Sequence, residues 1–242
     1  MPVPAFTLNQ LWQATLDGIR RDFWTLFAVA APFVLLVQVG LALFGPEPPK
    51  GMADFTPQVM VWLFILPSFI GTIGQLAVID LVARPGHLPR QALGAALAMA
   101  PAYLLGTLLG SFAAGLGMLA LVIPGLYILA RLYVVAPVAM LEGLGPIPML
   151  KRSWALTENH GGTILLFMLT TTFGYLLMSL VAAAIGSAIG SVLAIIKLAG
   201  VANFVAALVP AMVGNGVAVL AGSAAVAVYR ATVPPDQGAI FR

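Results

Sequence analysis

One arginine interrupts a long apolar stretch, and it is the residue of this sequence best suited to specific chemistry. The stretch PGLYILARLYVVAPVAMLEGLG runs from Pro124 to Gly145 and carries Arg131 in its middle. An arginine at the centre of a membrane helix costs about 2.5 to 3.5 kcal/mol on insertion scales, so a chain keeps it where the cation finds partners. The planar guanidinium also binds phosphate bidentately. Arg131 is therefore the first candidate for a functional site.

Several polar residues elsewhere in apolar segments are candidate partners for this cation. Glu142 follows eleven residues later on the same face, but a rise of about 1.5 Å per residue puts it about 16 Å away. Asp80 is a better candidate, and the side-chain amides of Gln75, Asn203 and Asn215 are further ones. Three roles stay open for Arg131: an internal clamp, a binding point for an anionic lipid headgroup or another anion, and a step in proton relay or transport.

The sequence lacks the residue sets that common enzymes use. It has no cysteine and two histidines, so thiolate chemistry and disulfides are excluded and no metal-ligand cluster is visible. It contains no G-x-S-x-G elbow, no P-loop and no dinucleotide-binding fingerprint. We therefore expect no catalytic site, no metal and no cofactor.

The composition indicates the elements that must position Arg131. Hydrophobic residues make up 61% of the 242 residues and charged residues 8%, against about 25% charged in an average soluble domain. The mean hydropathy is +1.05. A soluble chain of this length cannot bury so much apolar surface, so the surrounding solvent must be lipid. We predict an all-α integral membrane protein that forms a single polytopic domain over residues 1–242.

Uncharged stretches separated by polar loops predict six crossings, since one crossing needs about 20 residues. The uncharged run from Gln91 to Ala130 would be about 60 Å long as one helix, so it must turn, and Ile123–Gly125 is the natural corner. The predicted crossings lie at about 23–44, 59–82, 93–121, 126–141, 163–190 and 201–229.

The positions of the basic residues predict the orientation, because cytoplasmic segments carry an excess of lysine and arginine. With both termini cytoplasmic, Lys50 and Lys197 fall on the opposite side of the membrane, the outside. The remaining basic residues other than Arg131 fall inside: Arg20, Arg21, Arg84, Arg90, Lys151, Arg152, Arg230 and Arg242. This asymmetry favours six crossings.

Two amphipathic segments are predicted to lie along the cytoplasmic surface of the membrane. Residues 7–21 begin with Thr7 and Gln10, a capping-box spacing, and residues 146–160 follow the fourth crossing. Their basic and aromatic residues suit anionic phospholipid headgroups rather than nucleic acid; they are Arg20, Arg21, Lys151, Arg152 and Trp154. The alternative is that these residues are ordinary interface anchors.

The segment from Pro124 to about Phe167 resembles a bacterial membrane family described as YciC-like, or as the membrane domain of glycerophosphoryl diester phosphodiesterases. The resemblance rests on a P-G-x-Y start, an arginine, a P-V-x-x-L-E-G end and a K-R-S-W-x-L-T segment. The matching positions are Pro124, Gly125, Arg131, Pro137, Glu142, Gly143, Arg152, Ser153 and Trp154. It implies a six-helix inner-membrane domain of poorly defined function. In some relatives a soluble phosphodiesterase domain follows, whereas here only RATVPPDQGAIFR follows Tyr229.

These observations favour a non-catalytic inner-membrane protein that binds or organises phospholipid, or assists another envelope protein. The alternative is a small transporter or channel with Arg131 and Asp80 in its path. A lipid-active enzyme would need a nucleophile or a metal set that we do not find. The sequence leaves the ligand and the oligomeric state open.

Overall fold

The computed structural model describes residues 6–46, 49, 51, 54–195 and 199–233, and this part of the chain is helical without a β-strand. Lys50, Lys197, Arg242 and the side chain of Asn203 lie outside what it describes. Six helical stretches are long and apolar enough to cross a membrane: Leu8–Leu41, Pro57–Ala83, Pro89–Ala120, Val122–Glu142, Gly161–Leu193 and Phe204–Thr232. The prediction of an all-α chain with six such stretches is confirmed.

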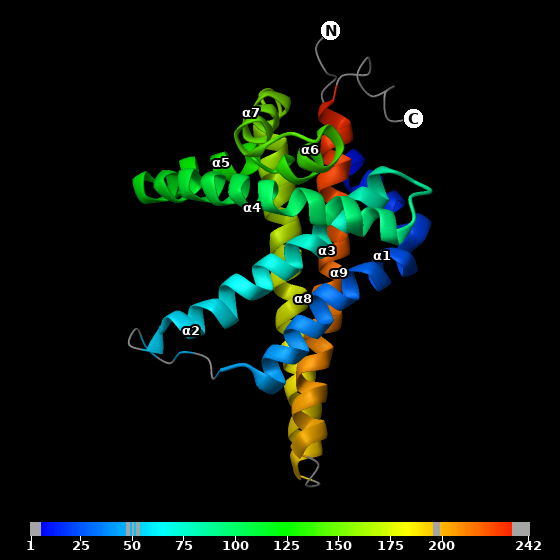
Figure 1. Cartoon of the computed structure of the whole chain (residues 1–242), viewed down its shortest axis with the longest axis vertical. Helices are drawn as coiled ribbons and strands as arrows, with labels where there is room; N and C mark the ends of the chain where they lie inside the picture. The colour runs from blue at the N-terminus through cyan, green and yellow to red at the C-terminus, as the bar shows by residue number, and fades with distance from the viewer. Residues whose placement is uncertain (1–5, 47–48, 50, 52–53, 196–198, 234–242) are drawn as a thin grey trace.

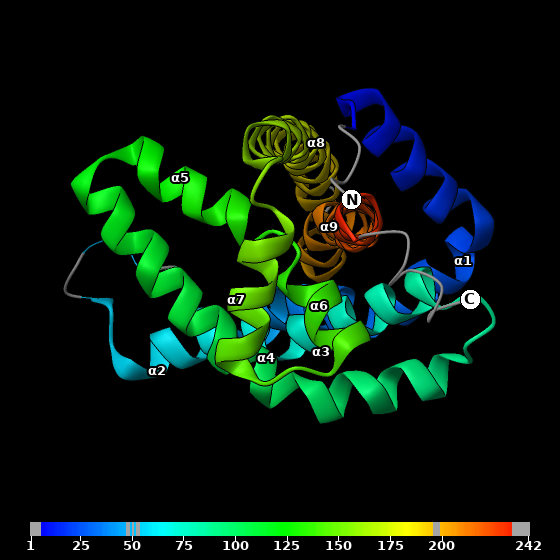
Figure 2. The same cartoon turned by 90° about the horizontal axis from the view of Figure 1, so that it is seen from above.

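The long helices form three hairpins that point in different directions (Figure 1). The hairpin of α8 and α9 runs vertically, that of α4 and α5 lies across it, and that of α1 with α2 and α3 slants between them. Figure 2 shows α8 and α9 nearly end-on while the other two hairpins spread sideways. The elements are α1 Leu8–Phe44, α2 Pro57–Met60, η2 Val61–Ile65, α3 Leu66–Ala83, α4 Pro89–Ala120, α5 Val122–Arg131, α6 Val135–Glu142, α7 Pro146–Leu156, α8 Gly161–Ile195 and α9 Ala199–Thr232.

Helix α1 consists of two segments with a break at Asp22. The backbone there leaves the helical region, with φ −146° and ψ 41°. The break separates the segment predicted over 7–21 from the crossing predicted over 23–44. Thr7 begins the first segment with the predicted capping box: its backbone N–H donates to Gln10 Oε1 at 2.8 Å, and Gln10 N–H donates to Thr7 Oγ1 at 3.4 Å.

The fourth stretch differs from its prediction, since α5 ends at Arg131 and α6 begins at Val135. An unbroken helix would bond the Val135 N–H to the Arg131 carbonyl, but that N–H donates to the Leu132 carbonyl instead, at 3.1 Å. Pro137 has no N–H to offer to the Tyr133 carbonyl, which weakens the helix at the same place. The break leaves the Arg131 carbonyl free for partners from α7.

The long helices pack closely against one another in some places and expose large apolar side chains in others. A Cβ on Gly186 would come within 2.8 Å of the Ala206 carbonyl oxygen, and one on Gly190 within 3.0 Å of Ala206 Cβ, so glycine permits the approach of α8 to α9. Large apolar side chains farther along the helices stay open, among them Phe112, Leu119 and Ile123 on α4 and α5. Such a surface suits lipid and not water.

Candidate functional site

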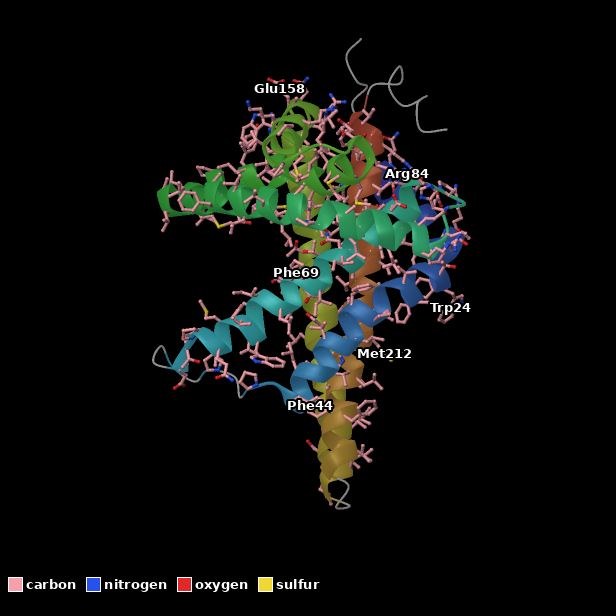
Figure 3. All side chains as sticks on the ribbon, viewed as in Figure 1. Trp24, Phe44, Phe69, Arg84, Glu158 and Met212 are labelled. Carbon is pink, nitrogen blue, oxygen red and sulfur yellow. The ribbon has the colours of Figure 1, made fainter. Side chains whose placement is uncertain are left out.

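Most of the described charged residues gather at one end of the molecule, where α5, α6 and α7 meet the ends of α3 and α9. Figure 3 shows Arg84 and Glu158 at this end, with nitrogen and oxygen atoms around them, and Phe69, Met212 and Phe44 below. The buried apolar side chains of α6 and α7 pack there against the start of α1 and the end of α9. Three separate groups of polar contacts lie at this end.

The first group, the Arg131 cluster, consists of Arg131, Tyr127, Trp154, Ser153 and Thr157. The Arg131 side chain is 2% exposed, and its Cζ lies 4.7 Å from the Trp154 ring centroid and 5.8 Å from that of Tyr127. The freed Arg131 carbonyl accepts hydrogen bonds from Ser153 Oγ at 2.9 Å and Thr157 Oγ1 at 3.0 Å. These contacts fix the backbone and the side chain of Arg131 against α7.

The guanidinium of Arg131 has no counter-ion in the described part of the chain. Its Nε and Nη1 are buried without a hydrogen-bond partner. A desolvated cation–π contact contributes about 2 kcal/mol, whereas each buried unsatisfied donor costs about 1–3 kcal/mol and more when it is charged. The aromatic rings therefore do not offset the cost of burying this cation. The described residues supply no acceptor for Nε and Nη1.

The second group, the Asp80 cluster, consists of Asp80, Arg84 and His87. Asp80 is fully buried; its Oδ1 accepts from Arg84 Nη1, and its Oδ2 lies 2.8 Å from His87 Nδ1. Arg84 also donates from Nη2 to the Met140 carbonyl at 3.2 Å, which ties α3 to α6. The expectation that Asp80 pairs with Arg131 is therefore wrong. The i, i+4 spacing of Asp80 and Arg84 on one helix is the signal that could have predicted this pair.

His87 reaches Asp80 because the chain turns sharply after α3. Gly86 has φ 96°, and the His87 N–H donates to the Arg84 carbonyl at 3.1 Å. Proline followed by glycine at the two central positions is typical of a type II turn, which needs a positive φ at the second. The turn folds His87 back over the end of α3. The contact of His87 with Asp80 was not predicted from the sequence.

The third group, the Glu142 cluster, consists of Glu142, Arg152 and Tyr229. Arg152 Nε donates to Glu142 Oε2 at 2.9 Å and to Oε1 at 3.1 Å, and the Tyr229 hydroxyl donates to Oε1 at 3.0 Å. One carboxylate thus joins α6, α7 and α9. Arg152 was a candidate for headgroup binding, but the structure places it in this internal contact. Tyr229 was not among the site residues predicted from the sequence.

The remaining predicted residues lie apart from these three groups. Asn215 is buried and donates from Nδ2 to the Phe27 carbonyl at 3.0 Å, so it ties α9 to α1. Gln75 is half-buried on α3. Arg20, Arg21 and Lys151 are exposed. Among the predicted headgroup residues, the structure therefore brings only Arg131 and Trp154 into contact, within the limits of the described residues.

A search for metal-binding groups and comparisons with known proteins give no further indication of the site's function. Within the described ranges, no group of three His, Cys, Asp or Glu side chains could hold a metal ion. The resemblance over residues 124–167 stays a prediction that the geometry does not test. No protein-family model matches this chain, and no curated protein and no solved structure is significantly similar to it.

Proposed function

We propose that this chain is a non-catalytic, multi-pass protein of a bacterial inner membrane that binds the headgroup of an anionic phospholipid at the Arg131 cluster. The observation that carries the proposal is the guanidinium of Arg131, which is buried beside two aromatic rings with Nε and Nη1 unpaired among the described residues. A phosphate offers several strong acceptor oxygens to such a cation. Its negative charge would also supply the counter-ion that the described residues lack.

The surroundings of the cluster favour a lipid as the source of this phosphate. Trp154 and Tyr127, which contact the guanidinium, are 42% and 41% exposed, and Ile147 on the same helix as Trp154 is 57% exposed. The opposite face of α7 is buried through Met149, Ser153 and Leu156. Helix α7 thus packs one side on the protein and presents an aromatic and aliphatic side outward. Tryptophan is enriched at the level of lipid headgroups.

The alternatives have less support. An internal clamp would give Arg131 a carboxylate or an amide partner, but Asp80 and Glu142 have other basic partners and Asn215 donates to the Phe27 carbonyl. A transport path would join the polar residues, yet Arg131, Asp80 and Glu142 belong to three separate groups of contacts among the described side chains. The predicted orientation, with both termini and α7 at the cytoplasmic face, is part of the proposal, as is the resemblance to the YciC-like family.

The proposal is tested by native mass spectrometry of the full chain released from nanodiscs that contain phosphatidylglycerol and phosphatidylcholine in equal amounts. Wild type should retain phosphatidylglycerol. Arg131→Met, which keeps an unbranched side chain and removes its charge, should lower that retention at least tenfold. Arg131→Lys should keep part of it. Arg90→Met is the matched control, because Arg90 is exposed at the start of α4 and its loss changes the net charge equally.

Two outcomes would contradict the proposal. If Arg131→Met retains as much phosphatidylglycerol as wild type, the cluster binds no headgroup. If Arg131→Met no longer inserts or folds while Arg131→Lys does, the cation serves an internal contact. Circular dichroism and thermal melting of each variant in detergent separate these two results.

A further inference from the structure

A second candidate binding site lies between the first part of α1, the turn after α3 and the end of α9. The three elements enclose a pocket of about 440 Å³, which falls within the usual range of small-molecule sites. Its lining includes charged residues from α1 and α9 and a histidine from the turn: Asp17, Arg21 and Asp22 from α1, His87 from the turn and Arg230 from α9. Leu26, Leu81 and Val82 supply apolar surface beside them. The Arg131 cluster contributes nothing to this lining.

Two of the lining residues are held in place before any ligand arrives. Arg230 donates from Nη2 to the carbonyls of Val82 at 3.0 Å and Ala83 at 2.9 Å, the last residues of α3. His87 is oriented by its contact with the buried Asp80. Fixed side chains lose little conformational freedom on binding, so such a site is preorganised. Neither of these contacts involves a charged residue of α1.

The charges of α1 in this pocket lack ion-pair partners within the described residues. Arg21 forms no salt bridge there, and its positive charge lies close enough to Arg230 to repel it. Asp17 and Asp22 likewise form no salt bridge among the described side chains. Two guanidinium groups that face one cavity create a place for an anion, and two carboxylates beside them create a place for a cation. The pocket thus presents both signs of charge next to an apolar surface.

We propose that this pocket binds a phospholipid headgroup that carries both a phosphate and a primary ammonium, as phosphatidylethanolamine does. The phosphate would accept hydrogen bonds from Arg21 and Arg230, and the ammonium would donate to Asp17 and Asp22. A quaternary ammonium has no N–H to donate and is usually recognised by aromatic rings. No phenylalanine, tyrosine or tryptophan is among the lining residues. The pocket therefore suits phosphatidylethanolamine better than phosphatidylcholine.

This inference uses other residues than the proposed function and shares with it only the lipid surroundings. The test uses the full chain in nanodiscs made of equal parts of phosphatidylethanolamine, phosphatidylglycerol and phosphatidylcholine, with retained lipid read by native mass spectrometry. Wild type should retain phosphatidylethanolamine over phosphatidylcholine. Arg21→Met should lower retained phosphatidylethanolamine at least fivefold. Arg20→Met is the matched control, since the neighbouring Arg20 is exposed and does not line the pocket.

The carboxylates give a second, sharper readout. In the double variant Asp17→Asn with Asp22→Asn the ammonium loses its partners while the arginines remain, so retention should shift from phosphatidylethanolamine to phosphatidylglycerol. If Arg20→Met and Arg21→Met lower retained phosphatidylethanolamine equally, the lipid responds to surface charge in general and not to this pocket, which would overturn the proposal. An unchanged preference in the double Asn variant would overturn it as well. Arg131→Met should lower phosphatidylglycerol alone, so failure of one proposal is distinguishable from failure of the other.

Discussion

Asp80 and Arg131 are both buried charged residues near the same end of the molecule, but only Asp80 has ion-pair partners among the described residues. Asp80 is 0% exposed and Arg131 is 2% exposed. Asp80 has two basic partners, Arg84 and His87, which lie four and seven residues along the chain. Arg131 faces two aromatic rings and leaves Nε and Nη1 without acceptors in the described part of the molecule.

The difference separates a buried charge that has ion-pair partners among the described residues from one that has none. Asp80 lies near the end of α3. Its carboxylate contacts Arg84 and His87 and so orders the turn that connects α3 to α4. Its contacts are satisfied, so a ligand would gain little there. Arg131 is buried at a comparable depth, but the described residues compensate the cost of burying it only in part, through the two aromatic rings. Glu142, with Arg152 and Tyr229, resembles Asp80 in this respect.

The largest expected effect comes from breaking the Asp80 cluster. Asp80→Asn removes the charge that holds Arg84 and His87, and removing one partner of a buried ion pair costs about 3–5 kcal/mol. We expect about 3 kcal/mol, at the low end, because Arg84 and His87 are 30% and 40% exposed. The free energy of unfolding in mixed micelles measures it. Asp17→Asn, an exposed carboxylate on α1, is the control, and a loss below about 1 kcal/mol would contradict a structural role.

An intermediate effect is expected when the Glu142 cluster is broken. Glu142→Gln keeps an oxygen for the Tyr229 hydroxyl but removes the charge that Arg152 contacts, and hydrogen bonds to charged groups contribute about 1.5–3 kcal/mol. Because the Arg152 and Glu142 side chains are partly exposed, we expect the free energy of unfolding to fall by about 1.5 kcal/mol. A double-mutant cycle with Tyr229→Phe checks the link to α9. Strictly additive losses would mean that the Glu142 carboxylate does not couple α6 to α9.

The smallest effect sharpens the comparison at Arg131 itself. Trp154→Leu removes the closer ring from the guanidinium and should cost about 1 kcal/mol, within the range for a cation–π contact. In the Arg131→Met background the same change should cost close to nothing beyond lost packing. Thermal unfolding of the four proteins in detergent gives the coupling. If Trp154→Leu costs the same in both backgrounds, the ring contributes packing and does not stabilise the cation.

Local features of the fold were predictable from the sequence alone. The six apolar stretches follow from runs of about 20 uncharged residues, and the capping box at Thr7 and Gln10 follows from a spacing of three. The polar sequence around Asp22 marked the boundary at which α1 breaks. Each of these features depends on hydrophobicity or on hydrogen bonds between residues within about one helical turn, so the amino-acid order contains the information directly.

The pairing of the charges was decided by the tertiary structure. Tyr229 meets Glu142 across 87 positions, and Arg230 meets the Val82 carbonyl across 148. Such contacts depend on how each helix is rotated and where it crosses its neighbours, and here the hairpins spread in different directions (Figure 2). The break after Arg131 belongs to the same class, since Ser153 and Thr157 of another segment bind the freed carbonyl. The sequence marked Arg131 as a buried cation, and the packing of α5 against α7 left it without a counter-ion among the described residues.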